Sequence, residues 1–224
     1  MVMPLGFILS SRRNCPLPPR HCLLTFDDGP GDAVTDELLR VLRRFSVKAC
    51  FCVVGSEVVR RPAQTRAIAD DGHLLVNHGF HHRFADLWYR ERLELDLSRC
   101  DQAVADALGT PSRPLLWFRP PFGVLTPAVR EVSKTRRILT ITHFAFDTWF
   151  NSPTTFKPRK WIVADAKRRN GGIYILHDGL VSSGLSNVVR GYRDRSWIPR
   201  VVEEVLTALL AAGFHFPAPS EALA

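Results

Sequence analysis

The sequence predicts an α/β fold, built as a single domain from parallel strands that alternate with helices. The chain has 224 residues, of which 46% are hydrophobic, so it can bury a substantial core within one domain. Short apolar runs alternate with stretches in which apolar residues recur every three or four positions. This alternation is typical of βα units arranged around a parallel sheet.

The expected strands are short apolar runs at residues 22–26, 49–54, 74–76, 115–118, 138–142, 173–176 and 214–216. Within the second run, Cys50 and Cys52 fall on the same face of the strand. We interpret them as core packing, although a Cys-x-Cys pair also resembles half of a metal site.

Helices are indicated by apolar residues at helical spacing in the stretches 34–45, 93–108 and 198–209. Further helical stretches end near residues 71 and 170. Glycine is common just after the end of a helix, and the expected stops are Gly72, Gly109, Gly171 and Gly213. Trp88 could stack on a sugar ring, but it falls in a helical stretch and is expected to serve as packing.

The charge balance is basic, with 30 Lys and Arg against 22 Asp and Glu, a net charge of +8. The excess lies mainly between Arg130 and Arg200. Two interpretations stay open: a solvated surface, or a site for an anionic membrane or a phosphate-bearing substrate. The basic clusters lack the aromatic residues and motifs of nucleic-acid binders, so no nucleic-acid partner is expected.

The five cysteines are odd in number and form no paired framework, so no disulfide scaffold is expected. The apolar run 4–9 is followed, not preceded, by the basic residues Arg12 and Arg13, which is the reverse of a secretory signal. No stretch is long and apolar enough for a membrane-spanning helix. We therefore expect a cytoplasmic protein.

Polar residues follow most of the expected strands directly: Asp27 and Asp28, then Asn77 and His78, then Arg119, Asp147 and His177. The carboxyl ends of parallel strands open on the same side of a sheet, where α/β enzymes place their active sites. We therefore expect these five clusters to line one cleft.

His78 and His82 are four residues apart, so a helical turn would carry both imidazoles on one face, as two ligands of a Zn²⁺-like ion require. Alone, this spacing is weak evidence for a metal site, because a chain with eight histidines often contains such a pair by chance. With Asp28 as a third ligand, two imidazoles and a carboxylate leave a position open for water, as a catalytic site needs.

Asp27 and Asp28 are adjacent carboxylates that repel each other unless positive charge lies close by. A metal ion on one and a cation such as Arg119 beside the other would offset that repulsion. The alternative is that residues 28–31, Asp-Gly-Pro-Gly, form a solvated turn.

Four motifs resemble, in order and spacing, those of the polysaccharide deacetylases: Thr-Phe-Asp-Asp-Gly-Pro at 25–30, Asn-His-Gly-Phe-His-His at 77–82, Arg-Pro-Pro-Phe-Gly at 119–123 and Ile-Tyr-Ile-Leu-His-Asp at 173–178. The resemblance extends from His21 to Phe216. It implies a distorted (β/α) barrel of seven or eight mostly parallel strands, with a catalytic domain at 21–217, a lead-in at 1–20 and a tail at 218–224.

The resemblance also implies roles for single residues. Asp28, His78 and His82 would bind the metal, Asp27 would be the general base, and Arg119 would orient it. His177 would be the general acid, which suits an imidazole because its ordinary pKa of about 6.5 is close to neutrality.

The remaining roles concern the substrate and the acid. The backbone amide of Phe122 would help to hold the oxyanion, and Ile175 would line a pocket for the acyl methyl group. Asp147 would steady His177, although relatives usually have Asp and Trp adjacent whereas Thr148 separates Asp147 from Trp149 here. Trp149 is a candidate platform for a sugar ring. Gly79 replaces the Ser or Thr of relatives.

The expected function is metal-dependent removal of the N-acetyl group from an amino sugar, with Zn²⁺ as the first choice of metal and Co²⁺ or Mn²⁺ as alternatives. A bound metal activates water and polarises the amide carbonyl. The substrate would belong to an oligosaccharide, a polysaccharide or an anionic, lipid-linked glycan. Two other functions stay open: hydrolysis of another amide such as an N-formyl group, and carbohydrate binding without catalysis.

Overall fold

The computed structural model describes residues 17–139, 143–144, 158–180 and 194–224. Seven parallel strands form one curled sheet in the order β5-β4-β3-β2-β1-β7-β6. The strands are β1 (His21–Gly29), β2 (Cys50–Val53), β3 (Leu74–Asn77), β4 (Trp117–Phe118), β5 (Arg137–Ile138), β6 (His143–Phe144) and β7 (Gly171–His177). The parallel α/β prediction, and the distorted barrel that the resemblance implied, are confirmed.

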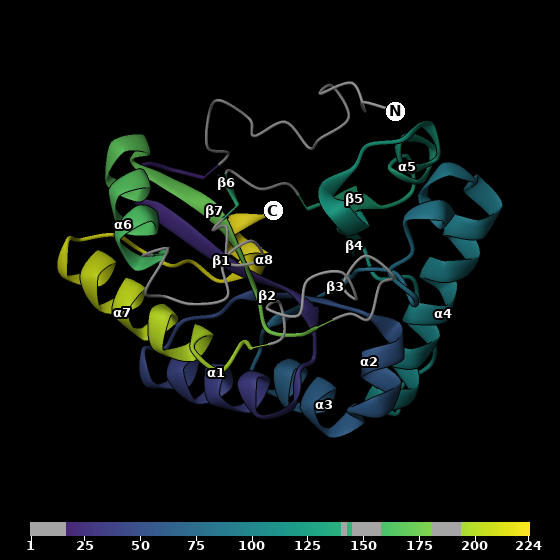
Figure 1. Ribbon diagram of the computed structural model, residues 1–224, viewed down its shortest axis with the longest axis horizontal. Helices are drawn as coiled ribbons and strands as arrows, with labels where there is room; N and C mark the ends of the chain where they lie inside the picture. The colour runs from purple at the N-terminus through teal and green to yellow at the C-terminus, as the bar shows by residue number, and fades with distance from the viewer. Residues whose placement is uncertain (1–16, 140–142, 145–157, 181–193) are drawn as a thin grey trace.

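Helices follow one another around the outside of this sheet, from α6 and α7 through α1 and α3 to α4 (Figure 1). The α-helices are α1 (Asp32–Arg44), α2 (Gly55–Arg60), α3 (Pro62–Asp70), α4 (Arg90–Leu108), α5 (Pro127–Val132), α6 (Pro158–Arg169), α7 (Ile198–Ala211) and α8 (Pro219–Ala222). The described residues also include two short 3-10 helices, η2 (Phe84–Trp88) and η3 (Pro121–Gly123). None of the described helices is long and apolar enough to cross a membrane.

Side chains alternate between the two faces of each strand. The outer face, with residues such as Leu24, Phe51 and Leu176, packs with α1 and α7 into the largest apolar cluster. The inner face carries a second cluster, which contains Leu17, Leu23, Cys50, Cys52, Val76 and Ile173, with Ala222 and Leu223 against it. Core packing of Cys50 and Cys52 is therefore confirmed. Cys52 pairs with Asp27 in the ladder between β1 and β2, so this cluster borders the polar side chains at the carboxyl ends of the inner face.

Three predictions about strand bounds and a helix end were wrong. The run 138–142 was predicted as one strand, but β5 ends at Ile138 and a separate strand β6 begins at His143. The run 214–216 forms only an isolated bridge from His215 to His21. Gly171 is the first residue of β7 rather than a helix stop, because Asn170 takes the left-handed conformation after α6, with a φ of 61°.

Candidate metal and catalytic centre

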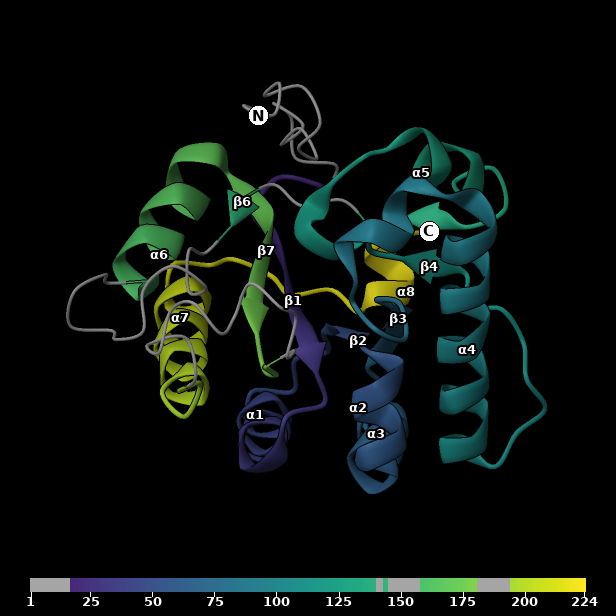
Figure 2. The ribbon, with the colours of Figure 1, turned by 45° about the vertical axis from the view of Figure 1, so that its right-hand side comes forward.

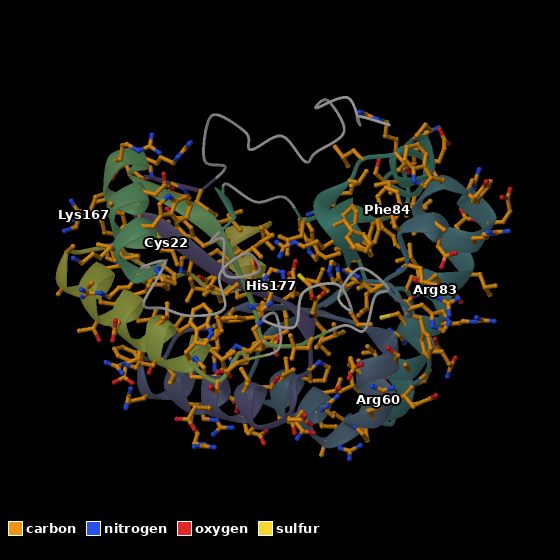
Figure 3. All side chains as sticks on the ribbon, viewed as in Figure 1. Cys22, Arg60, Arg83, Phe84, Lys167 and His177 are labelled. Carbon is orange, nitrogen blue, oxygen red and sulfur yellow. The ribbon has the colours of Figure 1, made fainter. Side chains whose placement is uncertain are left out.

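The predicted polar residues that the structure describes meet at the carboxyl ends of the central strands, which point to one edge of the sheet (Figure 2). Asp27 continues the inner-face series of Leu23 in β1, and His177 continues that of Ile173 in β7, because every second residue faces the same side. Asp27 and His177 are paired in the ladder between β1 and β7. His177 lies near the middle of the molecule (Figure 3) and is only 8% exposed.

A β-bulge brings both aspartates to this face. In a regular strand, Asp27 and Asp28 would point to opposite faces. The register between β1 and β2 shifts between Asp27 and Gly29, and Asp28 has a φ of 68°. As a result, Nε2 of His78 lies 3.8 Å from Oδ2 of Asp27 and 3.5 Å from Oδ1 of Asp28.

Asp28, His78 and His82 form a group whose ligand atoms all lie within 4.8 Å of one another. Oδ1 of Asp28 is 3.5 Å from Nε2 of His78 and 3.4 Å from Nε2 of His82. Both histidines are buried, and Oδ1 of Asp28 has no hydrogen-bond partner although it is buried. A buried carboxylate oxygen that faces two imidazole nitrogens fits a divalent cation.

Protonation in this group also suits metal binding. Nδ1 of His78 lies 2.7 Å from the carbonyl oxygen of Arg119. A carbonyl only accepts, so Nδ1 carries the proton and Nε2 presents its lone pair. Burial lowers the pKa of His82 to about 4, so this imidazole is neutral at pH 7. Burial alone would raise the pKa of Asp28, but the adjacent His82 and His78 lower it well below its usual range.

The predicted helical turn between His78 and His82 is wrong. Residues 78–83 form a loop after β3, and both Gly79 and His82 have positive φ, 78° and 52°. The two imidazoles still meet, with ring centroids 4.9 Å apart, because this loop folds back on itself. Strained backbone at ligand positions persists only where surrounding contacts hold it in place.

Two buried side chains supply those contacts. The Asn77 amide accepts from the N–H of Gly79 at 2.8 Å and donates to the Asp101 carboxylate at 2.8 Å. The Asp96 carboxylate, on α4, accepts from the backbone N–H of Phe80 at 2.8 Å and of His81 at 3.1 Å. Residues on β3 and α4 therefore fix the loop that carries both histidine ligands.

Gly79 makes room for the Asp96 carboxylate. A Cβ atom at position 79 would lie 2.5 Å from Oδ2 of Asp96, and the φ of 78° disfavours any L side chain. The glycine at position 79 is thus matched to an acidic residue on the neighbouring helix α4.

We expect Asp96→Asn to weaken metal binding while the fold is kept. An amide has only one acceptor oxygen, so one of the two loop N–H groups would face an NH₂ group instead. Loss of a contact that orients ligands typically reduces metal affinity about 10- to 100-fold. Calorimetric titration with Zn²⁺ measures this, with thermal unfolding as the check on the fold. Asp106→Asn, an exposed site on the same helix, is the matched control, and equal affinity in both variants would contradict this role.

Arg119 holds the second aspartate. Its Nη1 donates to Oδ1 of Asp27 at 2.6 Å and to Oγ1 of Thr25 at 2.7 Å, and its side chain is 1% exposed. Burial alone would raise the pKa of Asp27, but the positive charge of Arg119, with His78 and His177, lowers it below its ordinary value. Asp27 is therefore a carboxylate at neutral pH, as a general base must be, and the predicted partnership with Arg119 is present.

Two further predicted residues, Ile175 and Phe122, lie close to this group, and their roles stay predictions. Ile175 is buried and points to the same face of β7 as His177, two residues away. Phe122, in η3, has a φ of 59° and its ring centroid is 4.5 Å from that of His82. Asp147 and Trp149 lie outside the described residues, so their roles stay predictions.

Residues 28–31 do not form a solvated turn. Gly29 and Pro30 are buried, and a Cβ on Gly29 would lie 2.3 Å from the Asp178 carboxylate. A Cβ on Gly31 would lie 2.0 Å from the carbonyl oxygen of Asp178. The glycines therefore let the segment after β1 pack directly against the segment after β7, which draws Asp28 towards the end of the strand that carries His177.

Thr25, Asp96 and Asp101 were not predicted as site residues. One signal was available for the last two, because both lie on the apolar face of the helix predicted from Leu93 and Leu97. A carboxylate on the buried face of an amphipathic helix is rarely there without a partner. Which N–H groups it would contact could not be known without the fold.

Comparisons with known proteins agree with this fold. The profile of the family described as polysaccharide deacetylase matches residues 15–138. A peptidoglycan-N-acetylglucosamine deacetylase of Bacillus cereus is 30% identical, covering 89% of this chain and 86% of its own length. A chitooligosaccharide deacetylase of a Bradyrhizobium species is also 30% identical, over 88% and 87% of the two chains. The solved structure of a T48 deacetylase with substrate matches with a TM-score of 0.74 and 23% identity, covering 92% and 91%.

Proposed function

Because this chain belongs to the polysaccharide deacetylase family, we propose that it hydrolyses the N-acetyl amide of an amino sugar within an oligosaccharide or polysaccharide, releasing acetate and a free amine. The observation that carries this proposal is the buried group of Asp28, His78 and His82 beside the Asp27–Arg119 pair. The relatives named for peptidoglycan and chitooligosaccharides support N-acetylglucosamine polymers as the first substrates to test.

The metal would be held by Asp28, His78 and His82. A divalent cation bound there supplies Lewis acidity towards the amide carbonyl and towards water. We propose Zn²⁺ because two imidazoles and one carboxylate form a common catalytic zinc set, with Co²⁺ and Mn²⁺ as the alternatives.

Asp27 takes the proton of the attacking water in this proposal. Arg119 contacts Oδ1 of Asp27, whereas Oδ2 lies on the side of His78, 3.8 Å from its Nε2. Oδ1 of Asp27 thus fixes the carboxylate to Arg119, and Oδ2 faces the group of Asp28, His78 and His82. The ion pair keeps Asp27 ionised, so the base is ready at neutral pH.

His177 delivers the proton that the leaving amine needs. An amine leaves poorly as an anion, so a protonated group must stand near the nitrogen as the C–N bond breaks. The ladder places His177 beside Asp27 on the neighbouring strand. Base and acid therefore come from adjacent strands at the same level of the sheet. Ile175, on the same face of β7, would contact the acetyl methyl group.

Amine release from N-acetylglucosamine oligomers, measured before and after treatment with a chelator, tests this function. We expect the chelator to remove activity and added Zn²⁺ to restore it. Undiminished turnover after metal removal would contradict the proposal. An N-formylated oligomer in the same assay distinguishes a deformylase, and binding of the oligomer without amine release under Zn²⁺, Co²⁺ and Mn²⁺ would favour a non-catalytic carbohydrate-binding protein.

The anionic, lipid-linked glycan remains a narrower version of the proposal. It rests on the basic residues of α6, where Lys160 and Lys167 line a shallow hollow with Arg159. A comparison of turnover between neutral oligomers and their phosphate-bearing analogues at low and high salt would test it, because screening weakens only the charged contact.

A further inference from the structure

Asp178 ends the last of the four motifs, and the chemistry proposed above gives its side chain no role. Its backbone N–H donates to the carbonyl oxygen of Asp27 at 3.2 Å, so the pairing of β1 with β7 extends to this residue. Asp178 follows His177 directly, so its side chain points to the opposite face of the sheet. The residue is only 1% exposed. A carboxyl group is costly to bury without partners, so its contacts indicate its role.

One buried hydroxyl joins the Asp178 carboxyl group to the start of α1. Oδ2 of Asp178 accepts a hydrogen bond from Oγ1 of Thr35 at 2.6 Å. The same Oγ1 accepts from the backbone N–H of Gly31 at 2.7 Å. Thr35 is fully buried at the fourth position of α1, and Figure 2 shows β1 and β7 ending just above this helix. We refer to these two hydrogen bonds, from Gly31 to Thr35 and from Thr35 to Asp178, as the clamp.

The backbone beside the clamp is packed too closely for side chains. A Cβ atom at Gly29 would overlap both carboxyl oxygens of Asp178, and a Cβ atom at Gly179 would overlap the carbonyl oxygen of Asp28. The segment after β7 therefore lies directly against the backbone of Asp28. Because Asp28 has a φ of 68°, its conformation persists only where surrounding contacts hold it in place.

We propose that Asp178 and Thr35 are positioning residues, whose clamp holds the bulge that carries Asp27 and Asp28 against the end of the strand that carries His177. This inference rests on the proposed function, because it concerns the same centre. Both residues act through the backbone of residues 28–31 rather than by contact with the substrate. The clamp thereby sets the place of the base relative to the acid, and the direction in which Asp28 offers its carboxylate to the two imidazoles.

The test removes the hydroxyl of the clamp and keeps the size of the side chain. Thr35→Val leaves the Gly31 N–H and the Asp178 carboxyl group without the partner that they share. We expect the Kd for Zn²⁺, measured by calorimetry on the metal-free protein, to rise about 10-fold or more. For the N-acetylglucosamine tetramer, kcat should fall about 10- to 100-fold with little change in KM, because a small misplacement of reacting groups slows the chemical step. Thr35→Ser keeps the hydroxyl and should recover most of both losses.

Thr65→Val is the matched control. Thr65 is also fully buried at the fourth position of a helix, α3, and its hydroxyl donates to the carbonyl oxygen of Arg61 at 3.2 Å. Both valine variants lose one buried hydroxyl, so thermal unfolding should shift downwards in both. Only Thr35→Val should change the Kd for Zn²⁺ and kcat, because Thr65 lies outside the clamp.

Equal changes of Kd and kcat in the two valine variants, or no change in Thr35→Val, would overturn the clamp. Asp178→Ala removes its other end and should change both quantities in the same direction, so it provides the test if Thr35→Val does not fold. Unchanged values in Asp178→Ala would also overturn the clamp. Weaker Zn²⁺ binding in Thr35→Val but not in Thr65→Val, with no amine released by wild type, would contradict the proposed function and leave the clamp supported.

Discussion

Loss of the Asp28 carboxylate should abolish metal binding and reduce amine release to background. Asp28 supplies the one carboxylate in the group, and its Oδ1 lies 3.5 Å and 3.4 Å from the Nε2 atoms of His78 and His82. Two imidazoles would then remain without an anionic ligand. The loss of Zn²⁺ affinity should therefore exceed the roughly hundredfold loss that can follow removal of a residue that only orients a ligand. Calorimetry with the metal-free protein measures the affinity directly.

The choice of substitution matters because Asp28 has a φ of 68°. Alanine is strained in this region, whereas asparagine enters it more readily. Asp28→Asn therefore removes the charge and keeps the backbone, while Asp28→Ala also disturbs the bulge. We expect both to lose the metal, with thermal unfolding closer to wild type in Asp28→Asn. Unchanged Zn²⁺ affinity in Asp28→Asn would contradict the assignment of this ligand.

Asp27→Asn should have the opposite signature, retaining the metal but losing turnover. The amide oxygen cannot accept a proton at neutral pH, and loss of a general base typically reduces the rate about 10²- to 10⁴-fold. Zn²⁺ affinity should stay close to that of wild type, because Asp27 lies outside the three-ligand group. Measurement of kcat and of Zn²⁺ affinity on the same preparation separates these effects.

Asp27→Asn should also lower the free energy of unfolding. Arg119 is 1% exposed, and its Nε and Nη2 atoms have no hydrogen-bond partner. Neutralising Asp27 leaves that guanidinium without its counter-ion, and breaking a buried pair in this way typically costs about 3–5 kcal/mol. Activity should therefore be measured well below the lowered Tm. Equal metal loss in Asp27→Asn and Asp28→Asn would contradict the division of roles between the two aspartates.

Much of the fold followed from two periodicities in the sequence. Helical spacing at Val34, Leu38 and Leu42 predicted α1, and short apolar runs predicted β1, β2, β3 and β7 close to their observed bounds. The alternation of side chains along a strand also explains why Asp27 and His177 face the same side of the sheet. Both continue the inner-face series that Leu23 and Ile173 begin. Polar residues at strand ends were therefore a sound guide to the centre.

The errors arose where tertiary contacts override local pattern. The four-residue spacing of His78 and His82 suited a helix, yet the backbone there is fixed by Asn77 and by Asp96, which comes from α4. The bulge at Asp28 depends on pairing between β1 and β2, which no local pattern encodes. Short elements such as η2 and α5 are too brief to show a periodicity, so the 42% exposure of Trp88 at the end of η2 could not be foreseen.

The most direct test of the central claim is a crystal structure of the zinc-soaked protein with anomalous data collected on both sides of the zinc absorption edge. The account predicts one strong peak among Asp28, His78 and His82, at bonding distance from a carboxylate oxygen and two Nε2 atoms, with Asp27 beside it and still paired with Arg119. No peak at that position, or a peak bound by other side chains, would contradict it.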